Sequence, residues 1–288
     1  MKKLIITMLS ALLLFGSFVG CTPKKDSITL VYVNWAEGVA MTNLAAVILE
    51  ENFDVEVKMQ LADVGPVFAS LSTGDADVFM DTWLPITHKS YIEQFESKIE
   101  QLGTVYNNAK IGIVVPKYVY EQGITTIEGL KDYEDQFDGK IIGIDPGAGI
   151  MKAATIAMTE EGYGLNSSFE LQTSSEAGMI ATLSDAIDNN EPVAVTGWAP
   201  HWKFARWDLE FLADSKNVFG GEERIDIYSR KGFKEERPEI ANFFSKIKLN
   251  NQTLGDLMGK IANSSSKDPK PIVKEWVEEN FELINSWL

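Results

Sequence analysis

The sequence predicts an α/β fold of two lobes, each a mostly parallel sheet flanked by helices, with a ligand site in the cleft between them. Three observations support this prediction. Strand-like and helix-like segments alternate, the same order of segments occurs twice, and each half ends in a Trp-x-Pro sequence. Strands that alternate with helices favour parallel sheets covered on both faces. The 288 residues are also enough for two lobes of ordinary size.

The first half of the chain contains a predicted strand-helix-strand-helix-strand unit. Its elements are a strand at 28–33, a helix that ends at about 51, a strand at 55–61, a helix at 65–72 and a strand at 78–80. Asn34 to Gly38 form the loop that opens the first helix and contains Trp35. The third strand is expected to end in the loop 81–85, which contains Trp83.

The second half repeats this unit. Its elements are a strand at 140–144, a helix from 150 to about 161, a strand at 169–173, a helix at 176–189 and a strand at 193–196. The last strand is expected to end in the loop 197–200, which contains Trp198. Ligands bind beyond the carboxyl ends of parallel strands. The tryptophan loops of both halves should therefore line one cleft if the two lobes face each other.

Two further apolar segments are candidates for the connections between the lobes. The strand at 111–115 would carry the chain into the second lobe, and the segment 224–229 would return it. We therefore expect residues 28–111 and 224–288 to form lobe 1 and residues 112–223 to form lobe 2. The helical tail would then pack on lobe 1.

The N-terminus predicts secretion. Lys2 and Lys3 precede an apolar run that ends at Gly20 and Cys21, the only cysteine. The run is too short for a membrane span. Residues 1–20 are therefore read as a signal peptide, and residues 21–27 as a tether with a lipid on Cys21, at the outer face of a bacterial cell membrane. The pattern resembles the bacterial lipobox, and an ordinary signal peptide with an incidental cysteine is the alternative.

Composition argues against several classes of function. The net charge of -16 disfavours nucleic acid, because an acidic surface repels phosphate. The chain has no Gly-x-Ser-x-Gly elbow, only two histidines, and no thiol besides Cys21. We therefore expect no catalytic residues, no metal site and no cofactor, so that the chain is not an enzyme. A secreted hydrolase is the alternative from another class.

Trp35, Trp83 and Trp198 are the candidate residues for recognising a cation. A single tryptophan at a strand end is more often packing. Two at equivalent places in two halves, with a third in a neighbouring loop, favour a shared role. Converging indole faces attract a methylated ammonium that cannot donate hydrogen bonds. The sequence therefore predicts an aromatic cage for a quaternary ammonium.

An anion could bind at the loop 145–150, where small residues precede a helix. A helix N-terminus offers free N–H groups and partial positive charge. A plain turn that needs glycine for its geometry is the alternative. His88 follows Trp83 by five residues and could donate a hydrogen bond to a carboxylate. Capping or surface roles remain open for His88 and for the other histidine, His201.

Four motifs together carry a family resemblance. They are Tyr-Val-Asn-Trp-Ala-Glu-Gly at 32–38, Gly-Asp-Ala-Asp at 74–77, Trp-Leu-Pro-Ile-Thr-His at 83–88 and Gly-Trp-Ala-Pro-His-Trp at 197–202. The chain resembles the glycine betaine/proline betaine substrate-binding proteins of osmoprotectant ABC transporters, the OpuAC type, over nearly all of its mature length. The resemblance implies a two-lobed, type II periplasmic-binding-protein-like fold with the ligand in the inter-lobe cleft.

The resemblance also implies roles for particular residues and partners. The ammonium cage would be Trp35, Trp83 and Trp198, and the carboxylate would be held by His88 and the amides of Gly149 and Ile150. The chain would deliver its ligand to an ABC transporter permease and its ATPase. Choline or carnitine is the alternative ligand. Trp202 and Trp207 have no implied role and are expected to pack.

Overall fold

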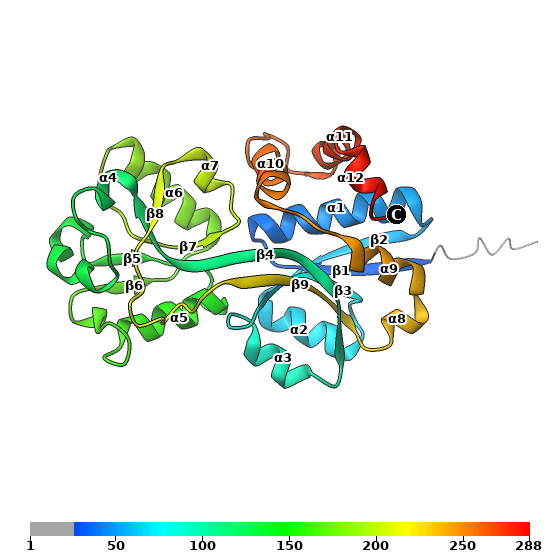
Figure 1. Ribbon diagram of the computed structural model, residues 1–288, viewed down its shortest axis with the longest axis horizontal. Helices are drawn as coiled ribbons and strands as arrows, with labels where there is room; N and C mark the ends of the chain where they lie inside the picture. Colours follow the sequence, from blue (N-terminus) through cyan, green and yellow to red (C-terminus); the bar gives the residue numbers. More distant parts are fainter. Residues whose placement is uncertain (1–25) are drawn as a thin grey trace, which may run out of the picture.

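Two α/β lobes lie side by side along the long axis of the molecule in the computed structural model, which describes residues 26–288 (Figure 1). The predicted signal peptide and Cys21 lie outside these residues, as does most of the predicted tether. Within residues 26–288, no helix is both long and apolar enough to cross a membrane.

The first lobe is built on three parallel strands. The central strand β1 (Ser27–Tyr32) pairs with β2 (Glu56–Leu61) on one side and with β3 (Val78–Leu84) on the other. Helices α1 (Ala36–Asn52) and α2 (Val64–Thr73) connect them and lie on opposite faces of the sheet (Figure 1). This arrangement brings the start of α1 and the end of β3 to the same edge of the sheet.

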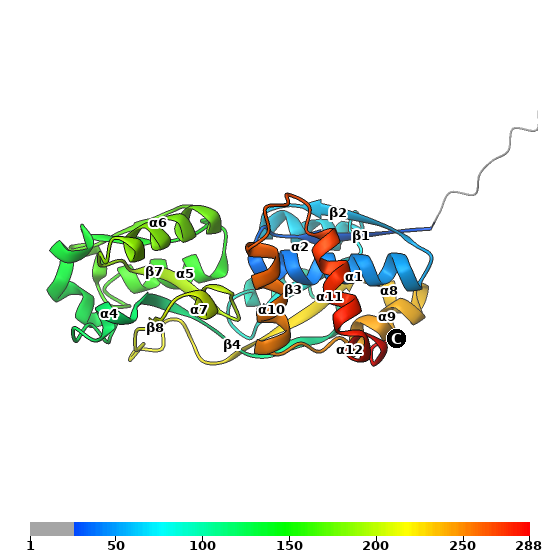
Figure 2. The same ribbon diagram turned by 90° about the horizontal axis from the view of Figure 1, so that it is seen from above.

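Helix α1 is buried on nearly all sides, from Glu37 to Leu49. It lies between the sheet and the C-terminal helices α10 (Asn251–Ala262) and α11 (Lys270–Glu279), which cover the first lobe (Figure 2). A helix that is apolar all round is stable in such a buried layer. Its first turn is therefore held rigidly beside the boundary between the lobes.

The second lobe repeats the design of the first. Strand β5 (Lys140–Ile142) pairs in parallel with β6 (Glu170–Gln172) and with β7 (Val195–Ala199). Helices α5 (Gly149–Met158) and α6 (Glu176–Asp188) connect these strands. The start of α5 and the end of β7 consequently face the first lobe.

Two strands run between the lobes. Strand β4 (Ile99–Pro116) pairs with β9 (Glu223–Arg230) in the first lobe and with β7 and β8 (Leu209–Phe211) in the second. All of these pairings are antiparallel, so the strand order β2-β1-β3-β9-β4-β7-β5-β6 forms one mixed sheet path. The predicted two-lobed α/β fold is confirmed, with antiparallel crossing strands added to the parallel strands of each lobe.

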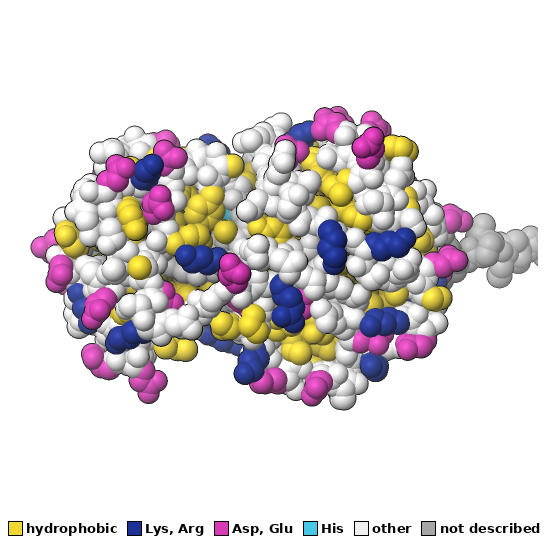
Figure 3. Space-filling model, in the orientation of Figure 1, with side chains coloured by type: hydrophobic (Ala, Val, Ile, Leu, Met, Phe, Trp, Pro, Cys, Tyr) yellow, Lys and Arg dark blue, Asp and Glu magenta, His cyan; other side chains and the backbone are white. Residues whose placement is uncertain are grey.

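The remaining elements are short or cover the outside of the lobes. They are α3 (Lys89–Phe95), α4 (Lys117–Tyr120), η1 (Glu128–Phe137), η2 (Leu165–Ser167), α7 (Lys203–Arg206), α8 (Phe233–Glu236), α9 (Pro238–Lys246) and α12 (Phe281–Asn285). On the face shown in Figure 3, acidic side chains are spread over the outer parts of both lobes, and hydrophobic side chains are scattered over both lobes and the boundary between them.

One local prediction was wrong. Trp83 and Trp198 were expected in loops after their strands, but β3 extends through Leu84 and β7 extends through Ala199. The reason is the antiparallel crossing strands, which continue the backbone pairing: Trp83 lies opposite Ile225, and Trp198 lies opposite Ile111. Both tryptophans are therefore fixed by a strand ladder rather than by a loop.

Candidate ligand-binding site

A pocket with about 290 Å³ of space lies at the boundary between the lobes. Its walls come from the start of α1 and the end of β3 on one side, and from the start of α5 and the end of β7 on the other. The lining residues are Trp35, Glu37, Trp83, Thr87, His88, Ile111, Ile144, Ala148, Gly149, Ile150 and Trp198. All six residues that the sequence singled out for ligand contact are thus brought together.

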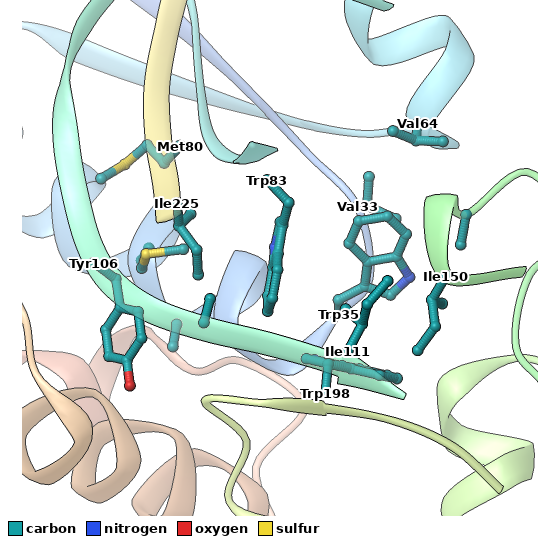
Figure 4. Close-up of a cluster of buried hydrophobic side chains, with 14 of the residues drawn as sticks. Val33, Trp35, Val64, Met80, Trp83, Tyr106, Ile111, Ile150, Trp198 and Ile225 are labelled. Atoms are coloured by element: carbon teal, nitrogen blue, oxygen red, sulfur yellow. The ribbon is translucent and has the colours of Figure 1, made fainter. Parts of the chain in front are cut away.

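Each of the three indole rings donates its N–H to a carboxyl oxygen. Trp83 donates to Asp81 at 2.7 Å, Trp198 donates to Glu37 at 2.9 Å, and Trp35 donates to Asp145 at 3.4 Å. These bonds satisfy the polar edge of each indole, so the rings offer their apolar faces to the pocket (Figure 4). The bonds of Trp198 and Trp35 join one lobe to the other.

His88 presents one hydrogen-bond donor to the pocket. Its Nδ1 accepts the backbone N–H of Trp83 at 2.9 Å, so Nδ1 carries no proton. Burial, with a smaller contribution from the nearby Lys152, lowers the pKa of His88 to about 3, so the ring is neutral at pH 7. A neutral imidazole then holds its proton on Nε2. This buried Nε2 has no hydrogen-bond partner among the described residues.

Packing holds the His88 ring and its loop in place. The ring stacks on Trp35, with the ring centroids 6.0 Å apart and the planes inclined by 14°. Glu223, at the start of β9, accepts hydrogen bonds from the backbone N–H groups of Ile86 at 3.0 Å and Thr87 at 2.9 Å. The loop before His88 is therefore tied to a strand that connects the two lobes.

The N-terminus of α5 supplies two further donors. Ala148 is the N-cap residue, so the N–H groups of Gly149 and Ile150 lie in the first turn and have no acceptor within the helix. The positive end of the helix dipole adds to their attraction for an anion. A Cβ added to Gly149 would lie 2.4 Å from the backbone oxygen of Thr87. Glycine here allows the two lobes to approach closely.

His201 lies outside this pocket. Its Nδ1 accepts the backbone N–H of Lys203 at 3.0 Å, and its Nε2 lies 3.0 Å from a Glu176 oxygen. Its ring packs edge-on against Trp198, with the centroids 5.0 Å apart. Both ring nitrogens are engaged, so His201 supports the back of the cage. Trp202 and Trp207 lie outside the pocket lining, with their ring centroids 5.7 Å apart.

Sequence reasoning missed a group of buried charged residues next to the cage. Glu37, Asp81, Glu176 and Lys203 are all buried. Burial raises the pKa of Glu37 to about 8 and that of Glu176 to about 7, and it raises the pKa of Asp81 well above its usual range. Burial lowers the pKa of Lys203 to about 7. Glu37 and Asp81 each stand two residues from a cage tryptophan, which was a usable signal.

Within the part of the chain that the structure describes, no group of three or more His, Cys, Asp or Glu side chains is placed to hold a metal ion. The pocket lining itself offers aromatic faces, N–H donors and the carboxyl group of Glu37.

Solved structures with a similar fold include two transport proteins. A lactococcal OpuAC, crystallised in a closed conformation with glycine betaine, is 32% identical with a TM-score of 0.83, covering 91% of this chain and 99% of that one. An ABC-transporter choline-binding protein in complex with choline is 27% identical with a TM-score of 0.84, covering 91% of each chain.

A curated relative and a family profile agree with these structures. The glycine betaine/carnitine transport binding protein GbuC of Listeria monocytogenes is 37% identical over 158 residues, which are 54% of this chain and 51% of GbuC. The match thus spans about half of that relative. Residues 26–279 match the family described as the substrate-binding domain of ABC-type glycine betaine transport systems. The chain belongs to this family, OpuAC, as its sequence motifs predicted.

Proposed function

We propose that this chain is the extracytoplasmic solute-binding lipoprotein of an ABC importer, which captures glycine betaine or proline betaine and delivers it to the permease. The observation that carries this proposal is the combination, in one pocket, of three indole faces with the neutral His88 donor and the helix α5 N-terminus. A betaine has the matching pair of groups, a quaternary ammonium and a carboxylate.

The ammonium end of the ligand is assigned to Trp35, Trp83 and Trp198. A methylated ammonium has no N–H to donate, so it gains most from the electron-rich faces of aromatic rings. Desolvated contacts of this kind contribute about 2 kcal/mol each. Three of them could supply most of the roughly 8 kcal/mol that corresponds to micromolar affinity, before the cost of association is subtracted.

The carboxylate end is assigned to His88 and to the amides of Gly149 and Ile150. All three groups donate N–H, and none needs to change its protonation state near neutral pH to do so. The two amides belong to lobe 2 and His88 to lobe 1, with lobe 1 taken as residues 28–111 and 224–288 and lobe 2 as residues 112–223. A carboxylate bound by all three would hold the lobes together.

The alternative ligands are carnitine and choline. GbuC is named for glycine betaine and carnitine, and one similar structure contains choline. Carnitine also combines a quaternary ammonium with a carboxylate, whereas choline offers the three N–H donors only a neutral hydroxyl oxygen. The donors therefore favour a betaine. The family is one of transport binding domains, and we assign the chain no catalytic role.

The location of the protein is part of the same proposal. A lipid on Cys21 would hold the binding domain at the outer face of the cell membrane, within reach of the permease and its ATPase partner. Metabolic labelling with a fatty acid, in the unchanged chain and in Cys21→Ala, tests the anchor.

Calorimetric titration of the mature protein tests the ligand. Glycine betaine, proline betaine, carnitine and choline are compared under one set of conditions. We expect micromolar or tighter binding of the betaines and weaker binding of choline. Absence of binding by every quaternary ammonium would contradict the proposed function. A preference for choline would contradict the assignment of the carboxylate donors.

A further inference from the structure

A cluster of charged and titratable side chains is buried between the cage and the surrounding helices. We call it the charge cluster, and its members are Glu37, Asp81, Glu176, His201 and Lys203. We propose that Glu37 is an affinity-determining residue of the pocket, and that a proton leaves the charge cluster when a quaternary ammonium binds. The inference rests on the proposed function, because it needs a cation in the tryptophan cage.

Glu37 is placed to face the ligand. It lies in the first turn of α1, is 1% exposed and lines the pocket. One of its oxygens accepts the indole N–H of Trp198 at 2.9 Å. The carboxyl group therefore borders both the edge of a cage ring and the space that an ammonium would enter. A negative charge at this point would add direct attraction to the contacts with the ring faces.

The groups around Glu37 come from every element packed against it. Asp81 on β3 lies close by, since the charge of Glu37 contributes to raising the pKa of Asp81. From the second lobe come Glu176 on α6, Lys203 on α7 and His201 just before it. His201 is neutral, because burial lowers its pKa well below the usual value. Three carboxyl groups thus share the single ammonium of Lys203.

Lys203 offsets only part of the carboxyl charge, because burial lowers its own pKa to about 7. Its Nζ is buried without a hydrogen-bond partner in residues 26–288, and it lies 4.1 Å from the ring centroid of Trp198. Trp198 lines the pocket and Lys203 does not, so the ammonium occupies the ring face turned away from the pocket. The remaining carboxyl charge is removed by bound protons, since burial and the repulsion of Glu176 raise the pKa of Glu37 to about 8.

A quaternary ammonium changes this balance when it enters. It brings a permanent positive charge beside Glu37, which stabilises the carboxylate and lowers its pKa in the complex. The O–H bond of the Glu37 carboxyl breaks, the electron pair stays on the oxygen, and the proton passes to the buffer. At pH 7, below the pKa of about 8, Glu37 is mostly protonated before binding. Binding therefore releases a proton at this pH.

Linkage then sets the direction of the pH dependence. A complex that holds fewer protons than the free protein becomes tighter as the pH rises. The affinity for betaine should increase from pH 6 to pH 8 and stay constant above pH 8. The total increase should be about tenfold for each unit by which the bound ligand lowers the pKa of Glu37. His88 does not contribute in this range, because its pKa of about 3 keeps it neutral. Glu176 and Lys203, each with a pKa of about 7, titrate within it, so the comparison with Glu37→Gln isolates the share of Glu37.

Calorimetry of the mature protein at pH 7 in two buffers of different ionisation enthalpy measures the proton directly. With glycine betaine, we expect the apparent binding enthalpy to differ between the two buffers. The difference should equal the number of protons released multiplied by the difference between the ionisation enthalpies of the buffers. Glu37→Gln keeps a carbonyl oxygen for the Trp198 N–H but carries no charge. The variant should bind like the unchanged protein at pH 6, about tenfold more weakly at pH 8, and with less buffer dependence.

An exposed glutamate gives the control. Glu56 lies on the solvent side of β2, so Glu56→Gln should leave the affinity, the buffer dependence and the pH profile unchanged. Betaine binding with the same enthalpy in both buffers and a flat pH profile would overturn the inference while leaving the proposed function intact. Equal weakening of Glu37→Gln at pH 6 and pH 8 would also overturn it, since that is the mark of a structural role. Absence of any betaine binding would remove both proposals.

Discussion

Replacing His88 by asparagine removes one donor from the pocket while keeping the contact that holds the ring. The amide oxygen of asparagine can take the place of Nδ1 and accept the backbone N–H of Trp83. In the unchanged protein this N–H donates to Nδ1 of His88 at 2.9 Å. No atom of asparagine reaches the position of Nε2. The His88→Asn variant therefore isolates the pocket donor better than alanine, which would also leave the Trp83 N–H without a partner in a buried site.

The expected loss follows from the chemistry of that donor. The Nε2–H of His88 is buried and has no other partner among the described residues, so a ligand carboxylate would form a charge-assisted hydrogen bond with it. Such bonds contribute about 1.5 to 3 kcal/mol. Glycine betaine should therefore bind about ten to a hundred times more weakly to His88→Asn. Choline has no carboxylate, so its residual binding should change much less.

Calorimetric titration of both ligands, in the variant and in the unchanged protein, measures the two losses. Thermal unfolding without ligand serves as the control for folding. The reasoning is refuted if betaine affinity stays unchanged. It is also refuted if betaine and choline weaken by the same factor, because that pattern would place the effect in the cage or in the fold rather than at the carboxylate.

Three further predictions use the same protein. Trp198→Ala should weaken betaine binding about thirtyfold from a lost contact of about 2 kcal/mol, whereas Trp287→Ala, at a buried site outside the pocket, should lower only thermal stability; equal losses of affinity would argue for packing. Gly149→Ala should weaken betaine binding about tenfold or more, because its Cβ would clash with the facing lobe. Gly147→Ala, whose Cβ would have its nearest contact 3.8 Å away, should bind normally, and small-angle scattering should show reduced closure of the lobes only for Gly149→Ala. The pKa of His88 is held near 3, below its usual value, so the unfolded chain takes up a proton at His88 as the pH falls below about 6.5 while the folded chain does not, and the folded protein loses stability. Between pH 7 and pH 4, the free energy of unfolding measured in urea should therefore fall by about 3 kcal/mol less in His88→Asn than in the unchanged protein. Identical pH profiles of the two proteins would contradict the burial of a neutral ring.

Local patterns predicted much of the fold. Alternating apolar segments and the loops between them identified β1, β2 and α2 to within two residues at each end, and the end of α1 to within one residue. Parallel strands place their carboxyl ends at one edge, and this rule was enough to expect Trp35, Trp83 and Trp198 around a common space. The repeated Trp-x-Pro sequences supported the same prediction, because a motif that occurs in both halves of the chain indicates equivalent positions in the two lobes.

Side-chain partners could not be predicted in the same way. The free nitrogen of His88 depends on the Trp83 backbone N–H, and the engagement of His201 depends on Glu176. The burial of Lys203 behind Trp198 has no local signature, because a lysine after a tryptophan is usually solvated.

The sequence by itself determined the order of the elements, the two-lobed architecture and the residue types gathered at the cleft, because these follow from periodicity and motifs within a few residues. Only the tertiary structure decided that β4 and β9 extend the strands through Trp83 and Trp198, which nitrogen of His88 faces the pocket, and that three carboxyl groups and one lysine surround the cage. The physical reason is that strand pairing, burial and protonation depend on atoms from segments far apart in the chain, which meet only when both lobes are folded.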